Sequence, residues 1–158
     1  MKTALITGAN KSIGFETAKV LLKNGYYVYL GSRDLQRGQQ AVDTLKAEGL
    51  TAVEVLQIDV ADEQSVQQAK ENLSQKTQSL DVLINNAGIL GSYDQKASDV
   101  SLATVREVYD TNFFGVIQVT QAFLPLVQKS DQGVIVNVTS GLGSLTLHSD
   151  PNWKHYHV

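Results

Sequence analysis

The stretch Thr7-Gly8-Ala9-Asn10-Lys11-Ser12-Ile13-Gly14 decides how this chain is expected to fold. It follows a short apolar run containing Leu5 and Ile6, and it precedes a segment with helical periodicity. A glycine-rich turn between a strand and a helix lets the backbone approach a pyrophosphate held by free N–H groups at the helix N-terminus. Taken alone, the same glycines fit a tight turn that needs a positive φ angle equally well.

Strand-like and helix-like segments alternate along the chain. Apolar runs typical of strands buried on both faces occur at residues 5–6, 26–30, 53–58, 82–84 and 134–138. Helical periodicity marks residues 12–24, 34–48, a segment opened by Asp62, and 101–128, where Pro125 is expected to bend or end the helix. Gly25 and Gly49 stand where left-handed C-terminal caps belong. The pattern predicts a doubly wound α/β fold with a parallel sheet, forming a single domain over residues 1–158.

Composition excludes several classes of protein. A chain of 158 residues with 42% hydrophobic and 18% charged residues is typical of one globular domain. Its net charge of −3, without a basic block, gives a nucleic-acid partner no electrostatic support. The lack of cysteine excludes disulfides and thiolate metal sites and fits a reducing compartment. The apolar run near the start is too short for a signal peptide, so a cytoplasmic protein without membrane anchoring is expected.

The end of the second predicted strand indicates which dinucleotide is bound. Arg33 at this position and Lys11 in the first loop supply two cations near the expected adenine ribose. An arginine there pairs with a 2′-phosphate, whereas a carboxylate accepts hydrogen bonds from a 2′-hydroxyl. NADP is therefore favoured over NAD. Asp34 is the rival ligand for an NAD ribose, although we interpret it as the N-cap of the following helix.

Two further strand ends carry small or polar residues. Asp59 and Val60 follow the third predicted strand, and Asn86, Ala87 and Gly88 follow the fourth. Ligands bind outside the carboxyl ends of strands in open α/β sheets, which makes these residues candidate cofactor contacts. They also suit plain loop caps and turns.

Two isolated polar residues are candidate catalytic groups. Asn112 falls on the apolar face of the helix predicted over 101–128, between Val108 and Val116. It is either a satisfied buried amide or a residue that perturbs the helix so that a carbonyl or a water reaches the site. Ser140, just beyond the fifth predicted strand, either points into the cleft or forms a turn.

Four motifs in this order resemble the short-chain dehydrogenase/reductase family: TGANKSIG at 7–14, NNAG at 85–88, DTNFFG at 110–115 and VIVNVTS at 134–140. Within the family, the segments ITGANK, GSRDLQRG, LDVLINNAG and TNFFG look most like those of NADPH-dependent carbonyl reductases. The resemblance implies a Rossmann-type sheet of order 3-2-1-4-5 and hydride transfer between NADPH and a carbonyl or alcohol. It assigns Ser140 as hydrogen-bond donor to the carbonyl and Asn112 as support for the proton relay. The candidate cofactor contacts are Gly8, Asn10, Lys11, Ser12, Ile13, Gly14, Arg33, Asp59, Val60, Asn86, Ala87 and Gly88.

Two departures from the family pattern change these expectations. Ser12 replaces the middle glycine of the first motif, so weakened cofactor binding is expected. The family's Tyr-x-x-x-Lys motif is missing, because Tyr156 is the only tyrosine after Ser140 and no lysine follows it before Val158. We therefore expect a C-terminally truncated member that lacks the later strands, with residues 141–158 as loop or tail. The alternatives to an oxidoreductase are a catalytically inactive NADP(H)-binding module and a non-functional fragment.

Association and metal binding complete the expectations. Without later strands, the fifth predicted strand is an exposed edge beside uncovered apolar faces, which favours association. The resemblance implies a homodimer through the helix predicted over 101–128. No metal site is expected, because His155 and His157 lack a nearby carboxylate or cysteine pattern.

Overall fold

The computed structural model describes residues 1–91 and 98–153. Within these residues, five parallel strands form one sheet in the order β3-β2-β1-β4-β5. The strands are β1 (Thr3–Ile6), β2 (Tyr27–Ser32), β3 (Val53–Gln57), β4 (Val82–Asn85) and β5 (Val134–Asn137). The principal helices are α1 (Ser12–Lys23), α2 (Leu35–Ala47), α3 (Glu63–Ser74), α4 (Leu102–Tyr109) and α5 (Gly115–Val127). The predicted α/β class and strand order are confirmed.

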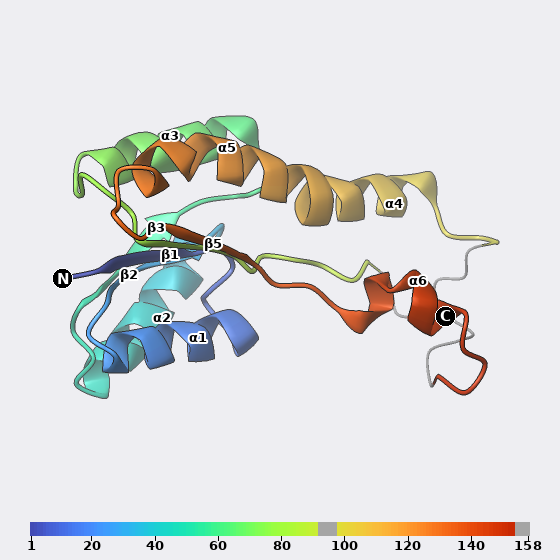
Figure 1. Ribbon diagram of the computed structural model, residues 1–158, viewed down its shortest axis with the longest axis horizontal. Coiled ribbons are helices and arrows are strands. Elements are labelled where there is room, and N and C mark those ends of the chain that lie inside the picture. The colour runs from blue at the N-terminus through green and yellow to red at the C-terminus, as the bar shows by residue number, and fades with distance from the viewer. Residues whose placement is uncertain (92–97, 154–158) are drawn as a thin grey trace.

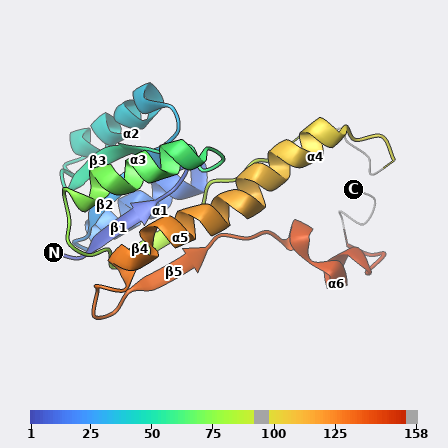
Figure 2. The same ribbon diagram turned by 90° about the horizontal axis from the view of Figure 1, so that it is seen from above.

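Helices cover both faces of the sheet. Helices α1 and α2 lie on one face, and α3 and α5 lie on the other (Figures 1 and 2). Successive strand residues point to opposite faces, so Leu5 joins the core under α3 and α5 while Ile6 joins the core under α1 and α2. Full burial of each such side chain contributes about 1.5–3 kcal/mol. This two-sided burial explains why the strands read as continuous apolar runs.

The helix ends follow the predicted capping pattern. The side chains of Asp34 and Asp62 accept hydrogen bonds from first-turn backbone amides of α2 and α3. Gly25 and Gly49 follow α1 and α2 with φ angles of +79° and +84°, in the left-handed region that closes a helix. Asp34 is therefore a helix cap, as interpreted from the sequence.

The segment predicted as one helix over 101–128 is instead three pieces. A π-helical turn, η1 (Asp110–Phe114), separates α4 from α5. Such turns insert an extra residue and are frequent at functional sites. Helix α5 continues two residues beyond Pro125 and ends at Val127. Pro125 is exposed in the last turn of α5, where the lost hydrogen bond is easily replaced by water.

The expectation that residues 141–158 form only loop or tail needs correction. They include a 3-10 turn, η2 (Gly141–Gly143), and a short helix, α6 (Leu145–His148). Serine side chains account for both, because Ser140 and Ser144 accept hydrogen bonds from the Leu142 and Leu147 amides. Tyr156, His155 and His157 lie outside the described residues.

One face of β5 is uncovered, as expected from the sequence. Ile135 packs into the core under α3 and α5, whereas the neighbouring Val134 and Val136 are 49% and 41% exposed. The register aligns Val136 with Ile84, which lies in the core on the α1 side. No helix covers β5 on that side within the described residues. No helix in the described part of the chain is long and apolar enough to cross a membrane.

Asp81 ties together the starts of β1 and β4. Its carboxylate accepts hydrogen bonds from the Thr3 amide at 2.7 Å and the Ser130 hydroxyl at 2.6 Å. Burial raises the pKa of Asp81, but the Ser130 and Thr3 hydrogen bonds and the nearby Lys2 charge outweigh it, so the pKa lies below 3.8. A carboxyl whose pKa is lowered by folding stabilises the fold above its unfolded pKa, and this contribution is lost as pH falls through the folded pKa.

We expect Asp81→Asn to lower the free energy of unfolding at pH 7 by about 1–2 kcal/mol, because charge-assisted hydrogen bonds become neutral or are lost. The difference between wild type and variant should stay constant from pH 7 to about 5 and shrink below about 4. Urea unfolding at several pH values measures it. A difference that grows on acidification would contradict the assigned role.

Candidate functional site

A cleft of about 330 Å³ lies at the carboxyl ends of β1, β2, β3 and β4. Ligands of open α/β sheets bind at this edge. The cleft is lined by all the candidate cofactor contacts expected from the sequence: Gly8, Asn10, Lys11, Ser12, Ile13, Gly14, Arg33, Asp59, Val60, Asn86, Ala87 and Gly88. Residues from four separate segments of the chain are thus brought together as predicted.

The loop after β1 is held rigidly against the loop after β4. The buried Thr7 hydroxyl accepts hydrogen bonds from the backbone amides of Asn86 and Ala87, both at 3.0 Å. The Asn86 side chain returns hydrogen bonds to the carbonyls of Thr7 and Gly8, at 2.9 and 3.1 Å. Gly8 has a φ of +62°, and a Cβ there would lie 2.9 Å from Ala87 Cα. Asn86 therefore fixes the glycine loop and is more than a turn residue.

The N-terminus of α1 opens into this cleft without a cap. Lys11 at the N-cap position makes no side-chain capping hydrogen bond. The first-turn N–H groups of Ser12, Ile13 and Gly14 have no hydrogen-bond partner within the described residues. By contrast, side chains cap α2, α3 and α4. Free N–H groups and the positive end of the helix dipole form an anion-binding site.

Gly14 makes room for this arrangement. A Cβ on Gly14 would lie 2.5 Å from Asn86 Nδ2 and 2.8 Å from both Ala9 Cα and the Gly8 carbonyl oxygen. Two of these three atoms belong to the backbone, and Asn86 is held by its own hydrogen bonds. The turn between β1 and α1 can therefore be this tight only with glycine at position 14.

The two predicted cations lie on the same cleft. The backbone amide of Ala9 donates to the Gly31 carbonyl at 2.8 Å, which joins the first loop to the end of β2 two residues before Arg33. Lys11 and Arg33 both line the cleft and are exposed. Asp34 does not line it, and its carboxylate accepts from the Arg37 amide and pairs with the Arg37 side chain at 3.4 Å. The local charge facing the cleft from the end of β2 is thus positive.

Asp59 and Val60 combine a structural role with a place on the cleft. Asp59 Oδ1 accepts a hydrogen bond from the Ala61 amide at 3.1 Å, and the Asp59 amide donates to the Ser65 hydroxyl at 2.8 Å. The Gln118 side chain of α5 donates to the Val60 carbonyl. The loop-cap interpretation of Asp59 is therefore correct, and the same loop also borders the cleft.

Asn112 is exposed, which corrects the expectation of a buried amide. Its part of the helix, within η1, extends beyond the carboxyl ends of the strands (Figures 1 and 2). Its side chain is nevertheless fully engaged, because Oδ1 accepts from the Ile89 amide and Nδ2 donates to the Ile89 carbonyl, both at 2.8 Å. Asn112 does not line the cleft but fixes the backbone of Ile89, which does. It also lies in the π-helical turn η1, which agrees with a perturbed helix, whereas the interpretation as a buried amide is wrong.

Ser140 is not among the residues lining the cleft. Its hydroxyl oxygen accepts a hydrogen bond from the Leu142 amide at 3.2 Å, which makes it the cap of η2. The turn-forming interpretation is therefore correct. Because the hydroxyl accepts this bond, its own hydrogen stays available for donation to another group.

Sequence reasoning missed three lining residues: Ile58, Ile89 and Thr111. Each is adjacent in sequence to a predicted site residue, namely Asp59, Gly88 or Asn112. Adjacency to a predicted site residue is the signal that could have found them. Ile58 lies in an apolar run and Thr111 in a predicted helix, whereas Ile89 follows the NNAG motif and has no signal of its own. The described residues contain no group of three His, Asp or Glu side chains that could hold a metal ion.

Ser12 adopts a φ of +51°, a conformation that costs a non-glycine residue about 1–2 kcal/mol. We expect Ser12→Gly to raise the free energy of unfolding by up to about 1 kcal/mol. Thermal unfolding measures this change. Ser12→Ala is the matched control, because it removes the hydroxyl and keeps the strained backbone; equal stabilisation by both variants would contradict backbone strain as the cause.

Comparison with known proteins identifies the family. The family model for short chain dehydrogenases matches residues 2–156. A short-chain dehydrogenase/reductase of Aspergillus fumigatus is 39% identical over 150 residues, covering 92% of this chain and 57% of the relative. The structure of salutaridine reductase from Papaver somniferum superposes with a TM-score of 0.85 at 32% identity, covering 93% of this chain and 60% of the other. The structure of ElxO with NADP bound superposes with a TM-score of 0.79 at 32% identity, over 88% of this chain and 55% of ElxO.

The chain spans between half and two thirds of the length of these relatives, with shares of 57%, 60% and 55%. The family model, in contrast, accounts for nearly all of the chain. The strand order and the residues of the cleft agree with this match. The chain belongs to the short-chain dehydrogenase/reductase family.

Proposed function

We propose that this chain binds NADP(H) in the cleft and forms the dinucleotide-binding part of an oxidoreductase acting on a small carbonyl or alcohol. The observation that carries the proposal is the uncapped N-terminus of α1, which opens into the cleft beside Lys11 and Arg33. Free N–H groups at a helix start suit a pyrophosphate. The absence of a Cβ at Gly8 and Gly14 lets the backbone reach it closely.

The preference for NADP over NAD rests on charge. Lys11 and Arg33 both line the cleft. An arginine can donate two hydrogen bonds to a phosphate, so we expect the 2′-phosphate to lie near these two cations. Asp34, the rival ligand for an NAD ribose, has its carboxylate occupied by the start of α2 and by Arg37. The similar ElxO structure has NADP bound, which supports the same choice.

The proposed chemistry divides between the cofactor and the chain. When bound, the nicotinamide cofactor supplies or accepts the hydride. Ser140 offers a hydroxyl hydrogen to a substrate carbonyl, since its oxygen already accepts from Leu142. Asn112 is a positioning residue that fixes the Ile89 backbone at the cleft. Reduction of a carbonyl also needs a proton donor. The cleft contacts named above concern the dinucleotide alone, so an NADP(H)-binding module without turnover is the second candidate function.

Calorimetric titration with NADPH and then with NADH tests the proposal on the full chain. We expect saturable binding of both, with NADPH at least about tenfold tighter because of its 2′-phosphate. A subsequent screen of carbonyl substrates at saturating NADPH distinguishes the two candidates: consumption of NADPH favours the oxidoreductase, and binding without consumption favours the inactive module. If neither NADPH nor NADH binds, both candidate functions are contradicted.

We also propose that two copies pair through the outer side of α4 and α5. Exposed apolar residues follow one another along α4, η1 and α5: Tyr109, Phe113, Phe114, Ile117 and Leu124. The rings of Tyr109 and Phe113 are in edge-to-face contact, as are those of Phe113 and Phe114. Exposed apolar patches of this kind mark interaction surfaces.

Light scattering measures the mass of the particle in solution. Wild type should have the mass of a dimer, and Phe113→Glu should have the mass of a monomer. A monomer mass for wild type at high concentration would refute the pairing.

A further inference from the structure

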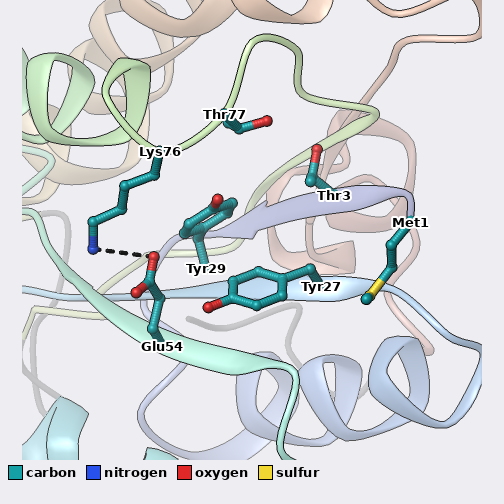
Figure 3. A pocket seen from close by; sticks show the side chains of 7 residues that line it. All are labelled: Met1, Thr3, Tyr27, Tyr29, Glu54, Lys76 and Thr77. Carbon is teal, nitrogen blue, oxygen red and sulfur yellow. Dashed lines mark ion pairs between the residues drawn. The ribbon is translucent and has the colours of Figure 1, made fainter.

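A second cavity, of about 550 Å³, lies toward the amino ends of β1, β2 and β3, opposite the strand ends that border the cleft (Figure 3). It is formed by the starts of β1 and β2, by β3 and by the residues that follow α3. The residues lining it are Met1, Thr3, Tyr27, Tyr29, Glu54, Lys76 and Thr77. None of them lines the cleft described above, so the cavity is a separate place on the molecule.

Tyr29 brings a hydroxyl to the cavity. The residue is 4% exposed and its ring packs in the core under α3 and α5. Its hydroxyl oxygen is not among the buried side-chain atoms that lack a hydrogen-bond partner, and it lies on the cavity side of the ring (Figure 3). The part of Tyr29 that a molecule in the cavity can reach is therefore its hydroxyl, which can pair with a polar group of a ligand or with water.

The two tyrosines form an aromatic corner beside a carboxylate. The ring centroids of Tyr27 and Tyr29 are 5.2 Å apart, with 53° between the ring planes. Burial, and then the Glu54 charge, raise the pKa of Tyr29 to about 12, and the same two causes raise the pKa of Tyr27. Both phenols are therefore neutral at physiological pH, beside the Glu54 side chain. Ring faces and a carboxylate both attract cations.

Lys76 already places a cation at this corner. Its Nζ lies 3.0 Å from Glu54 Oε1, and their side chains are 45% and 29% exposed. Figure 3 shows this pair at one side of the tyrosine rings, with Met1 and Thr3 at the other. Ion pairs as exposed as this contribute little to stability. A ligand cation can therefore displace the Lys76 ammonium from Glu54 at low cost.

We propose that this cavity binds a small organic cation of the ammonium class. The ligand's positive group lies between the Glu54 carboxylate and the partly buried ring of Tyr27, and a polar group of the ligand pairs with the Tyr29 hydroxyl. Lys76 competes for the same carboxylate. Removal of Lys76 should therefore strengthen binding, whereas loss of the Glu54 charge should weaken it, and this opposite response distinguishes an ammonium site from a general apolar depression.

Choline and its neutral isostere 3,3-dimethyl-1-butanol are the probes, followed through the ring-proton shifts of Tyr27 and Tyr29 by NMR of the full chain at constant salt. We expect saturable shifts with choline and about tenfold weaker binding of the alcohol. Glu54→Gln should reduce choline affinity about tenfold, and Lys76→Gln should increase it several-fold. Glu71→Gln, an exposed substitution on α3 away from the cavity, is the matched control and should change nothing.

Saturating NADPH should leave choline affinity unchanged, because the cleft and the cavity share no residue. Three results would each overturn the proposal: no saturable shift with choline, equal affinity for choline and the neutral alcohol, or weaker binding by Lys76→Gln. A damaged fold does not bind choline more tightly, so an increased affinity of Lys76→Gln cannot be an effect of misfolding.

Discussion

Gly14→Ala is expected to abolish measurable dinucleotide binding and to lower the free energy of unfolding by about 1–3 kcal/mol. The added Cβ would lie 2.8 Å from two atoms of the preceding loop's backbone, Ala9 Cα and the Gly8 carbonyl oxygen. It would also press on Asn86 Nδ2, which holds that loop in place. Relief requires the loop to move away from α1, and this movement disperses the N–H groups proposed to bind the pyrophosphate.

Calorimetry with NADPH and chemical unfolding measure the two effects of Gly14→Ala. We expect at least a hundredfold loss of affinity, equivalent to about 2.7 kcal/mol. Gly143→Ala is the matched control, because its Cβ would meet no atom within 4 Å. If Gly14→Ala binds NADPH with an affinity within threefold of wild type, the cleft is not the dinucleotide site.

The double variant Lys11→Ala/Arg33→Asp is expected to reverse the nucleotide preference. Wild type should favour NADPH, because Lys11 at the start of α1 and Arg33 after β2 both line the cleft and would attract the 2′-phosphate. In the variant, the new carboxylate repels that phosphate and accepts hydrogen bonds from the hydroxyls of an NADH ribose instead. The NADPH-to-NADH affinity ratio should fall by at least about a hundredfold, since each charge-assisted hydrogen bond contributes roughly 1.5–3 kcal/mol.

The ratio is obtained from paired titrations of the same protein preparation. Lys46→Ala/Arg106→Asp makes the same change in net charge at exposed positions outside the cleft. This control should leave the ratio within about twofold of wild type, since exposed charges beyond a Debye length are screened. An unchanged ratio in Lys11→Ala/Arg33→Asp would show that these cations do not read the 2′-phosphate.

Local sequence patterns predicted most of the architecture because each element carries its own signals. Strands buried on both faces give continuous apolar runs, and Asp34, Asp62, Gly25 and Gly49 mark helix ends by side-chain capping or positive φ. The strand order came from the motifs, since alternation of strand and helix is compatible with several orders. This strand order brings the predicted residues together at the carboxyl ends of the strands.

Features created by tertiary contacts could not be predicted in the same way. The spacing of apolar residues does not reveal the π-helical turn at Asp110–Phe114, so the sequence predicts Asn112 on a buried helix face. In the structure this turn extends beyond the sheet, and Asn112 is exposed. The residues around Ser140 fit either a cleft residue or a turn former, and only the tertiary structure shows that its hydroxyl caps η2. The cavity around Tyr29 was missed because alternating strand residues read as core, and their partners Glu54 and Lys76 come from distant segments.

Backbone amide shifts of ¹⁵N-labelled chain, recorded by NMR during addition of NADPH, locate the bound nucleotide. The largest shifts are expected at residues 8–14 and at Arg33, because the free N–H groups of α1 and the end of β2 line the cleft where we propose that the phosphates bind. Amides around Tyr27, Glu54 and Lys76 should stay unchanged, since they lie at the other edge of the sheet. Saturating shifts centred anywhere else, or no shifts at all, would contradict a dinucleotide site built on the loop between β1 and α1.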